Sequence, residues 1–327
     1  MREQILDMLI RNAQQYVSGQ QMCEVFGVTR AAIWKHIKAL QAQGYEIDAS
    51  PKKGYRLLGL PDLVQPALVQ RGMYTEVFGR TMVYKDTMES TNMTAKKLAA
   101  EGAEHGTLVL TEEQTQGKGR QSRTWFCPRS SGVMMSLILR PDIKTDPLPI
   151  TLMAAVAVSH TLRALTFLET KIKWPNDIVI GSKKVCGILT EAVTGGSGDI
   201  CVVVGIGVNV NMREEEIPPE LSDTATSLYV ERGLETSRLD VVRGICYDME
   251  LLYNAYVQSG DASDIIAQCR EHSATIGQRV RVIDGDSEIL GEATGIDDTG
   301  ALIVATDAGE RRILSGEISV RGIMGYV

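Results

Sequence analysis

The 327-residue sequence is poor in aromatic residues, in histidine and in closely spaced cysteine. Phe, Trp and Tyr make up 5% of the chain, and there are four histidines. The six cysteines lie far apart and none forms a Cys-x-x-Cys pair, which argues against a zinc site or a disulfide framework. Reduced thiols in the cytoplasm are therefore expected. No apolar run approaches the roughly 20 residues that span a bilayer. The N-terminal segment is too charged for a secretion signal, so we expect no membrane association.

Length and charge distribution predict a small basic module attached to an acidic body. A chain of 327 residues is too long for a typical single domain and suits two or three. The net charge is −7, but residues 1–60 hold eight Lys/Arg and five Asp/Glu, a net +3, which leaves −10 for the remainder. Because an acidic body binds nucleic acid poorly, we expect any DNA contact to be confined to the N-terminal module.

The segment from Ser18 to Ile47, SGQQMCEVFGVTRAAIWKHIKALQAQGYEI, predicts two helices joined by a tight turn. The first helix is expected over residues 19–26, with Gly27 in the turn and Thr29 as the N-cap of the second helix. Apolar residues at i, i+4 and i+7 give the second helix a buried stripe formed by Ile33, Ile37 and Leu40. Its opposite face carries Ala31, Lys35 and Lys38. A small residue beside two lysines suits the major groove of DNA.

The next segment, GYEIDASPKKGYRLLG, predicts two short strands around a Pro-Lys-Lys-Gly turn. With the preceding helices it resembles the winged helix-turn-helix of bacterial repressors. The residues expected to contact DNA phosphates or base edges are Thr29, Arg30, Lys35, Lys38 and Lys52. Lys53, in the same turn, is a further candidate for the DNA backbone. The alternative interpretation is a small helical docking domain with ordinary surface lysines.

A glycine-rich basic loop, TQGKGRQSRTW from Thr115 to Trp125, follows the predicted strand GTLVLTEEQ. It is not a Walker A motif, because no GxxxxGK[ST] occurs in the chain, and it is not a Rossmann fingerprint, because a strand follows it. Alone it is weak evidence of a phosphate site. Three further stretches place Gly, Lys, Asn or Asp at predicted strand ends: KWPND (173–177), KVCGIL (184–189) and GIGVNVN (205–211). Glycine within a strand indicates that something approaches the backbone closely.

The order of these motifs resembles that of the biotin protein ligases. Ser90-Thr91-Asn92 is followed by GKGRxxRxW, KWPND, KxxGIL and GIGxNVN. With the winged helix, the chain resembles the bifunctional type that is also the biotin operon repressor, over essentially its whole length. The family loop usually has the sequence GRGRxGR, whereas Lys118 and Ser122 replace an arginine and a glycine here. Lys118 keeps the charge but loses the planar guanidinium.

The resemblance implies an α+β fold in three domains. These are a winged helix-turn-helix DNA-binding domain (1–62), a biotin- and ATP-binding catalytic domain (63–274) and an SH3-like C-terminal β-barrel (275–327). The catalytic domain would hold a mixed sheet of the class II aminoacyl-tRNA-synthetase type, which we expect to be packed on one side. Alternating apolar residues and Asp-Gly-type turns in the C-terminal stretch favour a small barrel as well. Arg321 there would contact the ATP phosphates or the active-site rim, or would serve structure alone.

The implied activity has two steps and a regulatory role. Biotin and ATP, with Mg²⁺, form biotinyl-5'-AMP, and biotin then passes to a specific lysine of a biotin carboxyl carrier protein of acetyl-CoA carboxylase or another biotin-dependent carboxylase. The adenylate acts as corepressor at operator DNA, with the protein as a homodimer. The alternatives are a repressor that senses biotin without transferring it, and a lipoate ligase on the related scaffold.

The chemistry of these steps requires cations and one base. The biotin carboxylate and the α-phosphate of ATP, at about 4 Å, repel each other by roughly 4 kcal/mol at an effective dielectric of 20. This repulsion alone would slow adenylate formation by nearly a factor of a thousand. We expect Arg120 and Lys184 to offset this repulsion as catalytic residues, together with Lys118 and Arg123. The acceptor lysine must lose a proton, at a cost of about 4.6 kcal/mol at pH 7. Asp177 is the candidate base, or it merely caps the hairpin.

The ligand-binding residues that the resemblance implies are Ser90, Thr91, Asn92, Gln114, Gly117, Lys118, Gly119, Arg120, Arg123, Trp125, Lys184, Gly187, Gly205, Gly207 and Asn209. Ser90, Thr91 and Gln114 would bond the ureido ring of biotin. The strand glycines would let the ligand lie against bare backbone, and Asn209 would face the adenosine. Four alternatives stay open: Trp125 is a pocket wall or a core residue, Asn92 is a ligand or a helix cap, and Lys173 and Lys183 belong to the site or to the surface.

Overall fold

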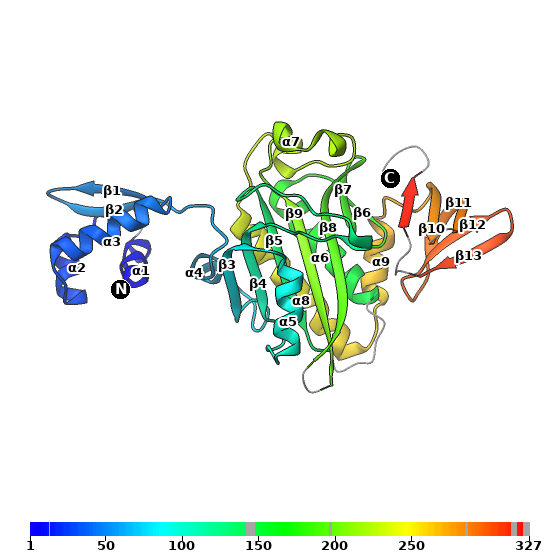
Figure 1. Ribbon diagram of the computed structural model, residues 1–327, viewed down its shortest axis with the longest axis horizontal. Coiled ribbons are helices and arrows are strands. Elements are labelled where there is room, and N and C mark those ends of the chain that lie inside the picture. The colour runs from blue at the N-terminus through cyan, green and yellow to red at the C-terminus, as the bar shows by residue number, and fades with distance from the viewer. Residues whose placement is uncertain (13, 142–147, 196–197, 285–286, 315–318, 323–327) are drawn as a thin grey trace. The chain divides into compact units, whose positions relative to one another are not determined.

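The computed structural model describes residues 1–327 apart from 13, 142–147, 196–197, 285–286, 315–318 and 323–327 (Figure 1). The chain divides into two compact units, Met1–Leu63 and Val64–Val327. The three-domain boundaries expected at residues 62 and 274 stay a prediction.

The first unit is a helix-turn-helix followed by a hairpin. Its elements are α1 (Arg2–Arg11), α2 (Gly19–Phe26), α3 (Arg30–Ala42), β1 (Glu46–Ser50) and β2 (Gly54–Gly59). Ser18 caps α2, and Gly27 ends it at φ +64°, in the left-handed region that glycine enters without strain. Thr29 caps α3 through a 3.3 Å bond from the amide of Ala32. The predicted helix-turn-helix is therefore confirmed, and α1 is an additional helix that the sequence interpretation had not assigned.

The second unit is built on a seven-stranded mixed sheet. Its strands are β3 (Met82–Met88), β4 (Leu108–Gln114), β5 (Gly132–Leu139), β6 (Thr170–Lys173), β7 (Asp177–Ile180), β8 (Lys183–Thr194) and β9 (Ile200–Asn209). Their order is β3-β4-β5-β9-β8-β7-β6, and in the described part of the chain the β3–β4 pair is parallel while the other five pairs of this sheet are antiparallel. The parallel pair is joined by α5 (Thr91–Ala100), as a crossover connection requires.

Helices cover both faces of this sheet, so the expectation of a sheet packed on one side is wrong. Ala95 and Ala99 of α5 pack with Val109, Ile138 and Val203 from one face. The other face meets α6 (Leu148–Thr166) and α8 (Arg238–Ser259), which contact β8 and β5 respectively (Figure 1). Every residue of β5 is buried, a pattern typical of a strand covered on both sides. The remaining helices are α4 (Pro66–Val69), α7 (Leu228–Arg232) and α9 (Ser263–Glu271).

Helix α6 is long and apolar enough, by length and composition, to cross a membrane, which corrects the statement that no such run exists. In the structure 72% of its most apolar window is buried. It packs against α8 and α9 and the sheet. This is the environment of a core helix, which needs the same composition as a membrane span.

The C-terminal part is a five-stranded antiparallel sheet. Its strands are β10 (Arg279–Asp284), β11 (Ser287–Ile296), β12 (Leu302–Thr306), β13 (Gly309–Ile313) and β14 (Ser319–Gly322), in the order β13-β12-β11-β10-β14. The described pairings form an open order, so closure into an SH3-like barrel stays a prediction. The backbone of Arg321, in β14, pairs with that of Arg281 in β10. The side chains of Arg321 and Ser122 lie outside the described residues.

Candidate active site

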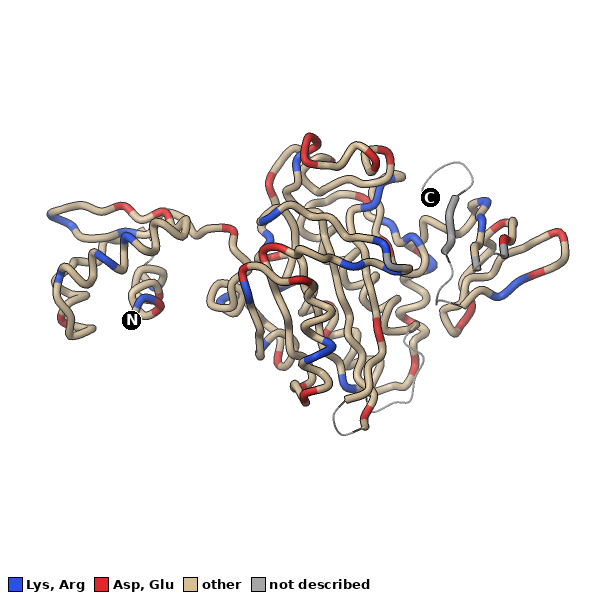
Figure 2. The backbone as a smooth tube through the Cα atoms, viewed as in Figure 1, with Lys and Arg blue, Asp and Glu red and all other residues tan. Residues whose placement is uncertain are grey.

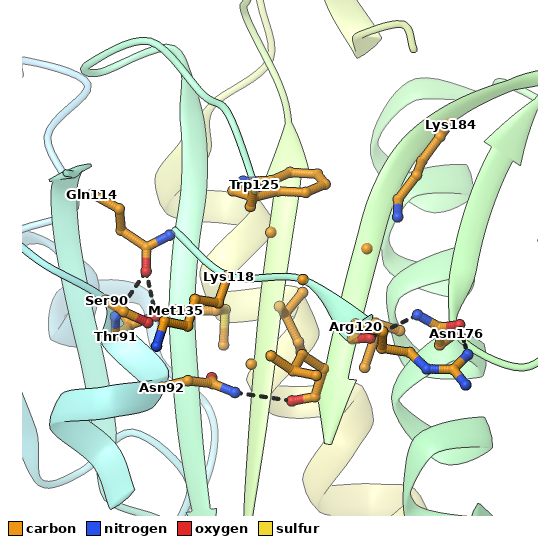
Figure 3. A pocket seen from close by; sticks show the side chains of 17 residues that line it. Ser90, Thr91, Asn92, Gln114, Lys118, Arg120, Trp125, Met135, Asn176 and Lys184 are labelled. Carbon is orange, nitrogen blue, oxygen red and sulfur yellow. Dashed lines mark hydrogen bonds between the residues drawn. The ribbon is translucent and has the colours of Figure 1, made fainter. Parts of the chain in front are cut away.

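The β3–α5–β4 crossover brings the start of α5 to the end of β4. The Ser90 hydroxyl caps the helix by accepting from the amide of Met93 at 3.4 Å. Thr91 donates to Gln114 Oε1 twice, from its amide at 2.7 Å and from its hydroxyl at 3.1 Å. Because Oε1 is already an acceptor for both donors, the amide nitrogen of Gln114 is the end left for a ligand (Figure 3). The site therefore presents a hydrogen-bond donor here.

Asn92 points from α5 across the sheet and does not cap the helix. Its Nδ2 donates to the Leu189 carbonyl at 3.1 Å (Figure 3). The same nitrogen donates to Glu191 Oε2 at 2.9 Å. Its Oδ1 accepts from the hydroxyl of Ser136 at 2.6 Å. A Cβ on Gly205 would lie only 2.0 Å from Asn92 Oδ1, so this strand position needs glycine. Ser136 is a buried support of the site that no sequence motif indicated.

Backbone hydrogen bonds join the two sides of the glycine-rich loop. The amide of Trp125 donates to the Gly117 carbonyl at 2.9 Å, and the amide of Gly119 donates to the Arg123 carbonyl at 2.7 Å. At its tip Gln121 adopts φ +54°, a region uncommon for residues other than glycine. Its Oε1 accepts from Arg123 Nη2 at 2.8 Å. Local hydrogen bonds thus hold the basic residues of the loop over the sheet.

The indole of Trp125 lies against the strand glycines Gly187 and Gly207 and lines a cavity. A Cβ on Gly207 would lie 2.5 Å from the indole, and one on Gly187 would lie 3.1 Å from it. The indole Nε1 is buried and has no hydrogen-bond partner within the described residues. The core tryptophan is instead Trp174, which is 2% exposed and donates to the Gly300 carbonyl at 2.9 Å. Trp125 is therefore the wall residue of the two alternatives.

Cationic side chains from the loop and from β8 meet at the KWPND segment. Arg120 Nη1 donates to Asn176 Oδ1 at 2.8 Å, and Lys184 Nζ lies 2.7 Å from Asp177 Oδ1. Lys184 Nζ also lies 5.6 Å from the centre of the Trp125 ring, within reach of a cation–π interaction. Burial lowers the pKa of Arg120, while Asp177 raises it and Arg123 lowers it further. Two separate segments therefore place positive charge beside one carboxylate.

Two cavities adjoin at this cluster. The smaller, of about 50 Å³, is lined by most of the expected ligand residues: Ser90, Thr91, Asn92, Gln114, Lys118, Gly119, Arg120, Trp125, Lys184, Gly187, Gly205 and Gly207 (Figure 3). The larger, of about 710 Å³, is lined by Arg123, Asp177 and Asn209 and again by Gly119, Arg120, Trp125 and Lys184. Gly117 lines neither of the two.

Further polar groups line the larger cavity or lie beside it. Asn209 is 4% exposed, donates to the Thr226 carbonyl at 2.9 Å, and has an Oδ1 without a partner within the described residues. Lys173 lines this cavity and is 6% exposed, so it is not a solvated surface residue. Lys183 donates to the Ser222 carbonyl at 2.8 Å, in the segment that borders the cavity. Asn176, which positions Arg120, belongs to the quoted motif but had received no role.

The five residues expected to contact DNA lie in the first unit. Thr29 is the N-cap of α3, and its oxygen is already used by the Ala32 amide. Arg30, Lys35 and Lys38 are exposed on α3, and Lys52 is exposed in the turn between β1 and β2.

Comparisons with known proteins match every part of this architecture. The chain is 38% identical over 321 residues to the bifunctional ligase/repressor BirA of Bacillus subtilis, covering 98% of both chains. It is 29% identical to the Escherichia coli BirA, covering 96% of this chain and 95% of that one. This chain belongs to the bifunctional biotin ligase/repressor family. Family models match in three places: an HTH domain over residues 1–56, the biotin/lipoate A/B protein ligase family over 84–209, and the biotin protein ligase C-terminal domain over 275–321.

A solved family structure has the same fold around the site. The biotin protein ligase of Aquifex aeolicus in complex with biotin and ATP aligns with a TM-score of 0.67 at 29% identity, over 74% of this chain and 99% of that one. The relatives named here are biotin ligases, which argues against the lipoate alternative. Within the described residues no group of three or more His, Cys, Asp or Glu gathers as a metal site.

Proposed function

We propose that this chain joins biotin to ATP as biotinyl-5'-AMP, transfers biotin to a lysine of a biotin carboxyl carrier protein, and represses biotin genes when it holds the adenylate. The observation that supports this most directly is the shared edge of the two cavities. Arg120 and Lys184, from separate segments, line both of them. One cavity suits a compact polar ring, and the other is large enough for a nucleotide.

Biotin binds in the smaller cavity. The amide nitrogen of Gln114, whose oxygen is occupied by Thr91, donates to the ureido carbonyl of biotin. Ser90 completes this polar end, and Trp125 covers the apolar ring and chain. Gly207 lets the indole lie against the strand backbone, and Gly205 leaves room for the Asn92 amide beside the ligand. The carboxylate of biotin then points towards Arg120 and Lys184.

The first step needs little beyond positioning and charge. The carboxylate of biotin is ionised at neutral pH, since such groups titrate near 4.3. Arg120, fixed by Asn176, and Lys184 stabilise the charge that develops on the α-phosphate as the carboxylate attacks and pyrophosphate leaves. Lys118 and Arg123 add charge from the loop. Asn209 faces the adenosine with its unpartnered oxygen.

The second step requires a proton acceptor. Asp177 lies at the start of β7, beside the larger cavity, and its carboxylate is 2.7 Å from Lys184 Nζ. When Lys184 turns to the phosphate, Asp177 is left to take the proton of the incoming lysine. Its hydrogen bond from Asn176 at 3.2 Å keeps the carboxylate oriented.

Mg²⁺ suits ATP in this site but has few protein ligands. Mg²⁺ commonly binds through one or two carboxylates together with substrate phosphates. Asp177 lies at the cation cluster, and Glu220 and Asp223 also line the larger cavity. Mg²⁺ would neutralise phosphate charge and would be held mainly by ATP itself, together with one or two of these carboxylates.

The repressor role rests on the first unit. Arg30, Lys35, Lys38 and Lys52 would contact the phosphates and base edges of operator DNA, with Thr29 at the helix start. The DNA-binding domain would span 1–62, the catalytic domain 63–274 and the C-terminal domain 275–327. A homodimer in the cytoplasm, formed when the adenylate is bound, would engage two half-sites.

Incubation with biotin, ATP and a carrier domain tests the ligase, with mass spectrometry of the carrier as readout. Biotin on a single carrier lysine is the expected result. Binding of biotin without any modified lysine would favour the sensor alternative instead. Operator affinity measured with and without biotin and ATP tests the repressor role. Equal affinities would show that operator binding does not depend on the adenylate that the ligase makes.

A further inference from the structure

A large aromatic side chain stands exposed on α3. Trp34 is 56% exposed, whereas Trp174 is buried and Trp125 lines the ligase site. On the helix Trp34 shares a face with Ala31 and Lys38, at spacings of three and four residues. This face was expected to meet DNA, yet the sequence interpretation assigned no role to the tryptophan.

Trp34 forms part of the wall of a groove between α3 and the β1–β2 hairpin. The groove has a volume of about 450 Å³, and its lining comes from residues 18–20 at the start of α2, from α3, and from residues 49–55. Its charged lining residues are Arg30, Lys52 and Lys53, and none of its thirteen lining residues is acidic. Figure 2 shows Lys and Arg along α3 and at the end of the hairpin. The groove therefore combines positive charge with an aromatic wall.

We propose that this groove holds one sugar-phosphate strand of duplex DNA, with Trp34 packed against the deoxyribose and base edge of that strand. When α3 enters the major groove and the hairpin contacts the adjoining backbone, the bordering strand must pass between them. Phosphates then meet Arg30, Lys52 and Lys53, and the apolar side of the strand meets the indole. The inference rests on the proposed repressor role and extends it to a residue that carries no charge.

A contact of this kind has a distinct signature in salt titrations. Each lysine or arginine that neutralises a phosphate releases counterions, so its removal lowers the slope of log affinity against log salt by about one. An indole releases none. Loss of Trp34 is therefore expected to weaken binding at every salt concentration by the same factor and to leave the slope unchanged.

The test uses the full chain with biotin and ATP, and a DNA duplex that the wild-type protein has selected from a random pool. Trp34→Ala is expected to bind about tenfold more weakly per half-site, or about 1.4 kcal/mol, with an unchanged salt slope. Lys52→Ala should weaken binding and reduce the slope. Leu58→Ala is the matched control, because Leu58 is 57% exposed but does not line the groove. Trp34→Phe should recover most of the lost affinity.

Each result decides the proposal. Ligase activity of all variants should equal that of the wild type, which shows that the second unit is folded, and an unchanged far-UV circular dichroism spectrum and thermal transition show the same for the first unit. If the wild type selects no duplex, the repressor role fails and the inference fails with it. If the wild type binds but Trp34→Ala binds within twofold of it, the groove assignment alone is wrong, and a protein partner becomes the occupant to examine. A changed salt slope in Trp34→Ala would also overturn it.

Discussion

Replacement of Lys184 by alanine is the perturbation with the largest expected effect on adenylate formation. The ammonium group lies 2.7 Å from Asp177 and lines both cavities, so it is placed to meet a phosphate. At about 4 Å and an effective dielectric of 20, one such charge pair is worth roughly 4 kcal/mol. The side chain is 25% exposed, and water reduces this to about 2–4 kcal/mol. The adenylation rate should fall about 30- to 1,000-fold.

The assay is single-turnover release of pyrophosphate from ATP and biotin. A second measurement supplies preformed biotinyl-5'-AMP and follows transfer to the carrier, which should fall much less because the charge to be stabilised has already formed. Lys171→Ala is the control: Lys171 lies on β6, is half-exposed and pairs with Glu169 at 3.5 Å. Thermal unfolding checks that loss of the Lys184–Asp177 ion pair has not destabilised the fold.

Two results would refute this reasoning. One is an adenylation rate for Lys184→Ala within threefold of the wild type. The other is an equal loss in Lys171→Ala, which would show that general surface charge, and not a cation at the cluster, accounts for the effect.

Two further predictions concern the close contact between Gly207 and Trp125 and the buried ion pair between Glu112 and Arg238. Gly207→Ala places a methyl group about where the indole of Trp125 lies and should weaken biotin binding about ten- to a hundredfold by calorimetry, whereas Gly295→Ala, whose Cβ meets nothing within 4 Å, should bind normally. Glu112→Gln leaves the fully buried Arg238 guanidinium without its 2.8 Å carboxylate partner and should cost about 3–5 kcal/mol of unfolding free energy in denaturant titrations. A loss below 1 kcal/mol would mean that this buried ion pair contributes little to the stability of the fold.

Sequence reasoning succeeded where the determinants are local. The caps Ser18 and Thr29 and the glycine at position 27 lie within a few residues of the turns that they form, so the helix-turn-helix followed from spacing alone. The cation cluster was expected from the resemblance of its motifs to those of the biotin protein ligases and from the charge that adenylation must offset. β7 and β8 bring Asp177 and Lys184 together across a short turn.

The remainder depends on contacts between residues far apart in the chain. The Arg238–Glu112 pair joins residues 126 positions apart, and Ser136 reaches Asn92 across 44. Nothing in a single sequence marks such a pair. The position of β9 between β5 and β8 and the second helical layer on the sheet arise in the same way. The continuous apolar character of β5 was the one available signal for that second layer, since a strand with one solvated face alternates.

The central claim is that Arg120 and Lys184 act on the charge of a nucleotide-linked acid. The most direct test compares the affinities of the Arg120→Gln/Lys184→Ala double variant for two ligands, a non-hydrolysable analogue of biotinyl-5'-AMP and neutral biotinamide, both by calorimetry. The account predicts at least a 30-fold loss for the anionic analogue and less than a threefold change for biotinamide. An equal loss for both ligands, or no loss for the anionic one, would contradict it.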